Sequence, residues 1–357
     1  MDINRLIEIT GKELLDEMIG LRLGFDLPVV ISVTAKPAEL HFLKDGKSNN
    51  ALFLELDIEL QPDAVDVVPG QLVLKAGWNK FGTAAREMQF FKKFAEQNDL
   101  PGVVKCFGTK WLQEEDMGLL LLEKISGDLT AYYRPDEDHL RQYKGAMKVL
   151  ANLHARWWNH SDLGRGELAY QWTEESLTPI IGIANDAFVE KIEACPLQWS
   201  SSEITTISSV LSNLQPLLLL HVKAGVPMCV GHGDAALWNF LIDRDEAKPP
   251  RLVDFQLWSV FPPAWDIAYM IVLLWPKEFR EAHGDKMITV YRQTLAAVGI
   301  SYSTKEFLTD LRVCIVALVA LVLVNWRLGF WAEDESKERL RGVLVAFQQY
   351  DCNRLFD

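Results

Sequence analysis

The stretch Cys229–Asp266 constrains this chain most, because it sets polar side chains at the ends of two short apolar segments. The first segment leads into His232-Gly233-Asp234, and Asn239 follows five residues after Asp234. The second segment leads directly into Asp254. Two carboxylates and an amide placed in this way are the groups that phosphoryl transfer requires. A carboxylate can orient and deprotonate a hydroxyl, while an amide and a second carboxylate can hold Mg²⁺.

A second His-Gly-Asp, at 283–285, shows that the tripeptide alone carries little information. No apolar segment precedes it, and the residue five positions after its aspartate is Val290. No aspartate at the end of an apolar segment follows it. We expect this second copy to lie in a polar loop. The spacing around Asp234, and not the tripeptide itself, therefore points to the chemistry.

The composition is that of an ordinary globular protein, with 49% hydrophobic and 24% charged residues in a chain of 357. This length suffices for one large domain or two lobes. The net charge of -13 disfavours nucleic acid as a partner, because phosphate backbones recruit basic patches. Five scattered cysteines without a C-x-x-C pair indicate free thiols in a reducing compartment.

Two features bear on the location of the protein. The N-terminal residues 1–18 are charged and amphipathic, and they lack the apolar core of a signal peptide. The longest apolar run, Val313–Val324, is well short of the roughly 20 residues that a membrane helix needs. We expect this run to be a buried core helix. The chain is therefore expected to be cytoplasmic and not to bind a membrane.

The first third of the chain is rich in predicted strands. Residues 51–60 alternate apolar and polar side chains, as a half-buried strand does. The patterns predict a helix at 3–23, strands at 29–33, 39–43, 51–60, 71–75, 103–111 and 118–122, and one inserted helix at 83–97.

The chain after Asp136 is mostly helical in pattern. Between Leu140 and Trp157, apolar residues recur at steps of three and four. We therefore expect an α+β chain with two lobes and a small-molecule site in the cleft between them. The predicted boundaries are a strand-rich N-lobe at 1–122, a hinge at 123–128 and a helical C-lobe at 129–357.

Three motifs together resemble a known family. They are His-Gly-Asp with asparagine five residues later, Asp254-Phe255-Gln256 followed by Asp266 and an apolar helix, and the helix end Leu153–Trp158. This set resembles the aminoglycoside phosphotransferase and choline kinase branch of the protein-kinase-like fold, and most closely its ecdysteroid-kinase-like (CHK-like) group. The resemblance implies a small N-terminal antiparallel sheet lobe with one inserted helix and a larger, mostly helical C-terminal lobe. It is specific only over 229–275.

The resemblance implies a role for each polar residue of the central stretch. Asp234 is expected to be the catalytic base, and Asn239 and Asp254 are expected to be Mg²⁺ ligands. His232 is expected to order the catalytic loop through hydrogen bonds. Asp266 resembles a buried aspartate that braces the loop backbone, and the alternative is a simple N-cap of the following helix.

The nucleotide-binding residues follow from position. Lys75 ends a strand where kinases place the lysine that neutralises the α- and β-phosphates, and Glu87 on the next helix is its expected partner. Lys80 and Glu96 are weaker competitors for these two roles. Ser48, in a polar turn between the first strands, is a candidate for phosphate contact. At the hinge, the backbones of Glu123 and Ile125 are expected to meet adenine.

These features predict an ATP- and Mg²⁺-dependent phosphotransferase that acts on a hydroxyl of a small molecule. The interval between Asp254 and Asp266 is too short for a phosphorylatable activation segment, which disfavours a protein substrate. Tryptophans 258, 265, 326 and 331 suggest an aromatic-walled acceptor site for an apolar or cationic alcohol, although core packing is the favoured explanation for most of them. The alternatives are a pseudokinase that binds a ligand without turnover, and an antibiotic-resistance kinase of the aminoglycoside type.

Overall fold

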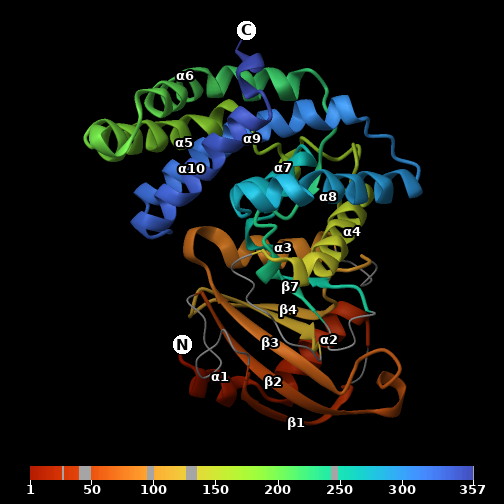
Figure 1. Ribbon diagram of the computed structural model, residues 1–357. Helices are drawn as coiled ribbons and strands as arrows, with labels where there is room; N and C mark the ends of the chain where they lie inside the picture. Colours follow the sequence, from red (N-terminus) through yellow and green to blue (C-terminus); the bar gives the residue numbers. More distant parts are fainter. Residues whose placement is uncertain (26–27, 40–49, 95–99, 126–134, 243–247, 357) are drawn as a thin grey trace. The chain divides into compact units, whose positions relative to one another are not determined.

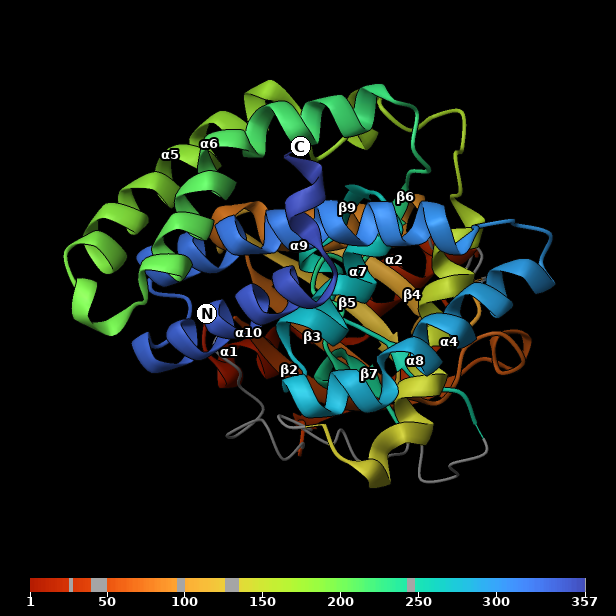
Figure 2. The ribbon, with the colours of Figure 1, turned by 45° about the horizontal axis from the view of Figure 1, so that its top comes forward.

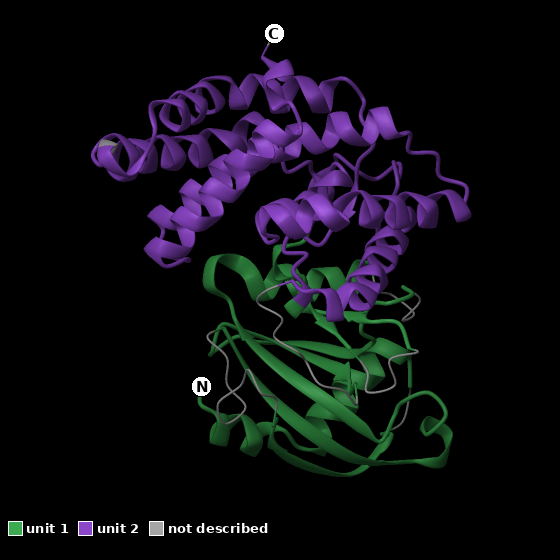
Figure 3. Cartoon of the chain, viewed as in Figure 1, with its two compact units in different colours: residues 1–132, 238–258 green, residues 133–237, 259–357 purple. Residues whose placement is uncertain are grey.

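The computed structural model describes residues 1–25, 28–39, 50–94, 100–125, 135–242 and 248–356. The chain forms two compact units (Figure 3). Unit 1 comprises Met1–Tyr132 and Trp238–Trp258, and unit 2 comprises Tyr133–Leu237 and Ser259–Asp357. The predicted strand at 39–43 falls almost entirely outside the described residues, as do the end of the predicted hinge and Ser48.

Unit 1 is built on a five-stranded antiparallel sheet with the order β1-β2-β3-β5-β4 (Figure 1). The strands are β1 (Val30–Pro37), β2 (Ala51–Leu60), β3 (Gln71–Trp78), β4 (Cys106–Leu112) and β5 (Met117–Glu123). Each of these strands overlaps a strand that the sequence predicts. The unit also holds the short helices α1 (Ile3–Ile9), α2 (Lys12–Leu23) and α3 (Thr83–Lys93).

The alternation of side chains along β3 gives the sheet two different faces. Leu72, Leu74 and Ala76 join the apolar cluster that includes residues of α1 and α2. Lys75 and Gly77 point to the opposite face, where α3 packs: a Cβ on Gly77 would lie 3.6 Å from the Cβ of Ala84. Because successive strand residues face opposite sides, the position of Lys75 in the strand directs its amine toward α3.

The single N-terminal helix predicted over residues 3–23 is two helices in the structure. Thr10 ends α1, with its backbone N–H bonded to the carbonyls of Leu6 and Ile7. Gly11 then precedes α2 in an extended conformation. Glycine destabilises a continuous helix by roughly 1 kcal/mol relative to alanine, which favours a break at this point.

A hairpin from the central stretch belongs to unit 1, whereas the sequence prediction placed it in the helical C-lobe. Its strands are β7 (Phe240–Leu241) and β8 (Arg251–Leu252). Leu252 accepts a hydrogen bond from the Val104 N–H at 3.1 Å and donates its own N–H to the Gly102 carbonyl at 2.7 Å. These backbone bonds attach the hairpin to the chain just before β4.

Unit 2 is mostly helical and packs around α9 (Thr304–Arg327), which contacts α5, α6, α7 and α10 (Figure 2). The other helices are α4 (Leu140–Arg156), α5 (Glu174–Ala187), α6 (Ser201–Lys223), α7 (Ala264–Ala268), α8 (Lys277–Ala297) and α10 (Glu333–Gln349). The short strands β6 (Cys229–Gly231) and β9 (Ser259–Phe261) pair antiparallel.

Helix α9 contains the apolar run that the sequence predicts to be a core helix. Within the described ranges it is the one helix long and apolar enough to cross a membrane, and 72% of its most apolar window is buried inside the protein. The helix is longer than the apolar run Val313–Val324, because Thr304–Arg312 and Asn325–Arg327 extend it at its two ends. Its burial is that of a core helix in unit 2.

The second His-Gly-Asp lies inside α8, so the prediction of a polar loop at 283–285 is wrong. The apolar face of α8 continues through the buried Gly284 to Met287 and Tyr291. A Cβ on Gly284 would lie 3.6 Å from the Arg280 side chain and 3.8 Å from the Tyr350 hydroxyl. Helical periodicity and close packing therefore outweigh the weak helix propensity of glycine here.

Gly108 on β4 offers a test of the packing between α2 and the sheet. A Cβ at this position would lie 2.6 Å from the Met18 Cβ and 2.7 Å from the Met18 carbonyl oxygen. We expect Gly108→Ala to lower the free energy of unfolding by about 1–3 kcal/mol, measured by urea denaturation. Gly77→Ala is the control, because its methyl group would meet Ala84 at an ordinary 3.6 Å. Equal stability of the two variants would contradict the packing described.

Candidate active site

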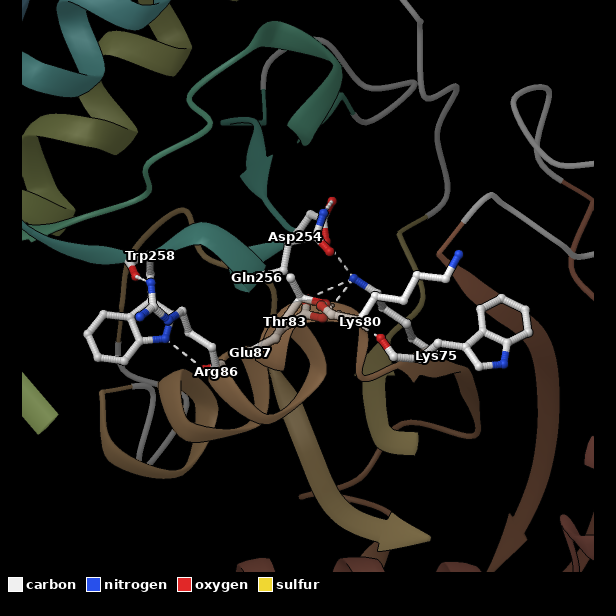
Figure 4. A network of polar contacts seen from close by, with 9 residues as sticks. Lys75, Lys80, Thr83, Arg86, Glu87, Asp254, Gln256 and Trp258 are labelled. Carbon is white, nitrogen blue, oxygen red and sulfur yellow. Dashed lines mark hydrogen bonds and ion pairs between the residues drawn. The ribbon is translucent and has the colours of Figure 1, made fainter. Parts of the chain in front are cut away.

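Lys75, Glu87 and Asp254 meet in unit 1 although they are far apart in sequence (Figure 4). The Nζ of Lys75 donates to Glu87 Oε1 at 2.8 Å and to Asp254 Oδ1 at 2.6 Å. Lys75 is 8% exposed and Glu87 is 3% exposed, whereas the side chain of Asp254 is 29% exposed. One ammonium group is thus shared between a buried carboxylate and one that reaches solvent.

The charge of Lys75 is stabilised by these two neighbours. Burial by itself would lower the pKa of Lys75, but the carboxylates of Asp254 and Glu87 outweigh it and raise that pKa above its ordinary value. Lys75 is therefore a fixed cation at neutral pH. A fixed, partly desolvated cation beside a solvent-accessible carboxylate is suited to binding phosphate groups together with a metal ion.

Asp254 has an unusual backbone conformation that sets the direction of its side chain. It lies in the left-handed region, with φ 68° and ψ 57°, at the junction between β8 and the short helical turn Phe255–Leu257. Aspartate tolerates this region better than most residues. Its Oδ2 accepts a hydrogen bond from Gln256 Nε2 at 3.2 Å, while Oδ1 accepts from Lys75.

The residues after Asp254 are anchored to α3, the helix that carries Glu87. The ring of Phe255 stacks on Phe90 with centroids 3.6 Å apart and planes within 8°. Trp258 Nε1 donates to the Arg86 carbonyl at 2.6 Å, and Arg86 donates back to the Trp258 carbonyl at 3.4 Å. The same short segment thus positions Asp254 and holds the helix that positions Glu87.

Asn239 lies at the same end of the β7–β8 hairpin as Asp254. Phe240 pairs with Leu252 in the hairpin, and the Asn239 carbonyl accepts the Val253 N–H at 2.9 Å. Asn239 is thus opposite the residue that precedes Asp254. The antiparallel pairing explains how an asparagine and an aspartate from separate apolar segments come to the same edge.

In unit 2, the loop that carries Asp234 is held by Asp266. The carboxylate of Asp266 accepts the backbone N–H of His232 at 2.7 Å and that of Gly233 at 2.9 Å. Asp266 lies inside α7, whose N-cap is Pro263. The alternative assignment of Asp266 as a helix N-cap is therefore wrong. A carboxylate that accepts two consecutive backbone N–H groups fixes the orientation of both peptide planes.

Asp266 is ionised despite its complete burial. Desolvation would raise the pKa of Asp266, but the hydrogen bond from His154, the electrostatic attraction of His154 and His232 and the hydrogen bond from the His232 N–H outweigh it. The net effect lowers the pKa of Asp266 below its ordinary value. The loop backbone is thus held by a full negative charge.

Asp234 itself contacts His232 and Tyr269 in unit 2. Its backbone N–H donates to His232 Nδ1 at 3.3 Å, so the buried imidazole closes the turn of the loop. The hydroxyl of Tyr269 is hydrogen-bonded to the Asp234 side chain. Burial, together with the negative charge of Asp234, raises the pKa of Tyr269 well above its ordinary value. Tyr269 therefore stays protonated and donates to the carboxylate.

The remaining predicted nucleotide residues are described only in part. Glu123 ends β5, where its N–H donates to the Lys105 carbonyl and its side chain accepts the Lys105 N–H, both at 2.9 Å. Ile125 follows it and is half-buried. Ser48 and Glu96 lie outside the described residues. Lys80 lies in the short turn before α3, and Lys75 is the lysine that meets Glu87.

Several residues of the site were not predicted from the sequence. Gln256, Tyr269 and the Arg86–Trp258 pair act through contacts that depend on tertiary structure. Gln256 and Trp258 had been named from the sequence, but only as part of the family motif and of the aromatic wall, and Tyr269 lies three residues after Asp266, about one helical turn. Most of the tryptophans proposed for an acceptor wall are buried: Trp258, Trp265 and Trp326 are 3%, 7% and 4% exposed. The aromatic wall then rests on Trp331 alone.

A family model described as the ecdysteroid kinase-like family matches residues 87–300. This match covers more than half of the chain and includes Glu87, Asp234, Asn239, Asp254 and Asp266. The chain belongs to the ecdysteroid kinase-like family. Lys75 lies before the matched region, so its assignment rests on the geometry alone. No curated protein sequence matches the chain significantly.

Solved structures with the same fold include small-molecule kinases. A microcompartment-associated aminopropanol kinase is 13% identical, with 89% of this chain and 92% of that chain covered and a TM-score of 0.56. Choline kinase from Cryptosporidium parvum Iowa II is 12% identical, with 90% of this chain and 91% of that chain covered and a TM-score of 0.54. A mutant of aminoglycoside phosphotransferase APH(4)-Ia in complex with ADP and hygromycin B is 12% identical, with 89% of this chain and 94% of that chain covered and a TM-score of 0.53.

These similarities confirm the α+β kinase-like fold predicted from the sequence. At such low identity they establish the fold and not the substrate. Family and fold together indicate a small-molecule phosphotransferase.

The shared ammonium of Lys75 can be tested through stability. In Lys75→Met, the carboxylate of Glu87 stays buried without its cation, so we expect the free energy of unfolding to fall by about 3–5 kcal/mol at pH 7. Adding Glu87→Gln removes the uncompensated charge and should restore a large part of the loss. Urea denaturation of the single and double variants measures the difference. Equal stabilities of the two would contradict a charged Glu87.

The lowered pKa of Asp266 makes a prediction about pH. A carboxylate with a depressed pKa stabilises the fold above its unfolded value, near 3.8, and this contribution is lost as the pH falls through the folded value. Asp266→Asn should therefore lower the free energy of unfolding by about 2–3 kcal/mol at pH 7. The difference from the unmodified protein should narrow below pH 3.8. Urea denaturation at several pH values would refute this if the difference grew toward acid.

Proposed function

We propose that this protein transfers the γ-phosphoryl group of ATP, with Mg²⁺, to a hydroxyl group of a small molecule. The observation that supports this most is the Lys75 ammonium bound between Glu87 and Asp254. This arrangement supplies a fixed cation for nucleotide phosphates and sets a solvent-accessible carboxylate beside it. Phosphoryl transfer depends on such positioning and charge neutralisation more than on covalent participation by the protein.

The donor set suits Mg²⁺. Among the described residues, no group of three or more His, Cys, Asp and Glu side chains could hold a metal by itself. Mg²⁺ does not need one, because it binds through one or two protein oxygens together with substrate phosphates and water. Asp254 and Asn239, at one end of the same hairpin, would supply these oxygens. Bound Mg²⁺ would offset the negative charge of the phosphates.

Asp234 is the proposed general base. Its carboxylate would accept the proton of the acceptor hydroxyl as the oxygen attacks phosphorus. Tyr269 donates to this carboxylate and Asp266 fixes the backbone just before it, so both ends of the residue are oriented. A carboxylate held in one orientation reduces the entropy that the reaction must lose.

The acceptor is proposed to be a small alcohol. Structures with this fold include an aminopropanol kinase, a choline kinase and an aminoglycoside phosphotransferase. Only eleven residues, 255–265, separate Asp254 from Asp266, and Phe255 and Trp258 among them pack on α3. The anchored segment supports a small-molecule acceptor over a protein, because it leaves little chain to present a protein substrate.

Asp234→Asn is the decisive variant. It removes the base while keeping the shape of the side chain, and we expect the rate of Mg²⁺-dependent phosphoryl transfer to fall about 10²- to 10⁴-fold. The matched control is Asp285→Asn, which alters the second His-Gly-Asp on the exposed part of α8 and should leave the rate unchanged.

The assay would incubate the protein with MgATP and a panel of alcohols, including aminopropanol, choline and hygromycin B. Product is detected as a mass increase of one phosphate. An unmodified protein that turns over no acceptor and hydrolyses no ATP would support the pseudokinase alternative. Transfer that persists in Asp234→Asn would refute the role of Asp234.

A further inference from the structure

His154 has no role in the function proposed above, although it lies in the helix end that resembles the family. It sits near the C-terminus of α4 and is completely buried. Both ring nitrogens have polar partners in unit 2. Nε2 lies 3.0 Å from Asp266 Oδ2, and Nδ1 lies 2.8 Å from the hydroxyl of Tyr291 on α8. A buried imidazole with two partners has a defined orientation.

The direction of each hydrogen bond follows from the chemistry of the partners. The Asp266 carboxylate has a lowered pKa and can only accept, so Nε2–H of His154 is the donor. Nδ1 shares the other hydrogen bond with the Tyr291 hydroxyl: a neutral ring accepts the hydroxyl proton there, and a protonated ring donates Nδ1–H to the hydroxyl oxygen. Burial raises the pKa of Tyr291 well above its ordinary value, which keeps this hydroxyl protonated. The ring is thus oriented by Tyr291 and points its N–H at Asp266.

The bond from His154 bears directly on the loop that carries Asp234. Oδ2 of Asp266 accepts from His154 and also from the His232 N–H, while Oδ1 accepts the Gly233 N–H. The carboxylate therefore holds the loop only in one rotation about its Cβ–Cγ bond. His154 is the side chain that approaches from α4 and selects this rotation.

We infer that His154 is a positioning residue. Oriented by Tyr291, it fixes the Asp266 carboxylate and thereby the backbone of His232 and Gly233, which sets Asp234 for catalysis. The catalytic part of this inference rests on the proposed function, whereas the structural link from His154 to the loop does not. The link runs from α8 through α4 to α7 and the loop.

Two amide variants separate the two ring nitrogens. In His154→Gln, the side-chain NH₂ can occupy the place of Nε2 and still donate to Asp266. In His154→Asn, the shorter side chain can place its oxygen near the Nδ1 position and accept from Tyr291, but no donor reaches Asp266. Both variants remove the imidazole and its packing. A difference between them therefore reports the hydrogen bond to Asp266.

The first readout is amide hydrogen exchange of His232 and Gly233, resolved by fragmentation of the peptide that contains them. We expect exchange at these two amides to be at least about tenfold faster in His154→Asn than in the unmodified protein. Even a modest decrease in the free energy of local opening raises the exchange rate by that factor. In His154→Gln it should stay within about threefold. Exchange in the sheet of unit 1 should not change in either variant.

The second readout is Mg²⁺-dependent ATP hydrolysis with water as the acceptor. Misplacement of a reacting group by about 1 Å can lower the rate roughly 100-fold, so we expect kcat to fall about 10- to 100-fold in His154→Asn. The KM for MgATP should stay within about threefold, because Lys75 and Asp254 are untouched. His154→Gln should retain most of kcat.

A second buried trio in unit 2 provides the control. His221 Nε2 lies 3.1 Å from Asp310 Oδ1, and Tyr302 donates to the other oxygen of Asp310. Beyond one another, these side chains contact the rings of Trp172 and Phe307. His221→Asn should destabilise the fold without faster exchange at His232 and Gly233.

Three outcomes would overturn the inference. They are equal exchange in the Gln and Asn variants, unchanged exchange in His154→Asn, and exchange in His221→Asn as fast as in His154→Asn. The assay of the unmodified protein tests the proposed function separately. If the unmodified protein hydrolyses no ATP and phosphorylates no acceptor, that function fails, and the exchange pattern still decides whether His154 holds the loop.

Discussion

The sharing of one buried ammonium between two carboxylates is the interaction on which the rest of unit 1 depends. Lys75 needs a strand to bring it to the correct face, and Glu87 needs a helix packed on that face. Asp254 needs a separate part of the chain to return to the same place. Each partner by itself would be an uncompensated or poorly compensated charge away from water. The sheet, the helix and the hairpin are therefore held to one arrangement by electrostatics as well as by apolar packing.

In unit 2, hydrogen bonds to a buried carboxylate hold the loop that carries Asp234. This loop is short and contains a glycine with positive φ, Gly233 at 83°, so its backbone has no regular partner. The ionised Asp266 supplies that partner, and His154 and Tyr291 in turn satisfy Asp266 and orient it. A buried carboxylate is stable only when its acceptors are filled. The groups that stabilise the negative charge of Asp266 are therefore the same groups that determine the geometry of the loop.

The sequence predicted those parts of the structure that local pattern determines. The alternation in 51–60 follows from the period of two, and β2 has it. Lys75 was predicted to end its strand, whereas β3 continues to Trp78, but its predicted partner Glu87 is the one that it meets. The family resemblance rested on spacing, and the family match includes the residues that carry it. The sequence placed residues 238–258 in the C-lobe, whereas the structure places them in unit 1. Their attachment depends on the Phe90–Phe255 stack and on backbone hydrogen bonds to Gly102 and Val104. Contacts between residues so far apart leave no periodic trace, and the same holds for Arg86 with Trp258.

The discontinuous make-up of unit 1 has a consequence for how the protein is made. A ribosome that has released residues 1–132 has delivered the whole sheet and α3, but not the hairpin or Asp254. At that stage Phe90 has no stacking partner from Phe255, and Lys75 lacks one of its two carboxylates. The entire run 133–237 must be synthesised before these partners emerge. The nascent N-terminal segment therefore carries an exposed aromatic surface on α3 for much of translation, which is the kind of surface that chaperones bind.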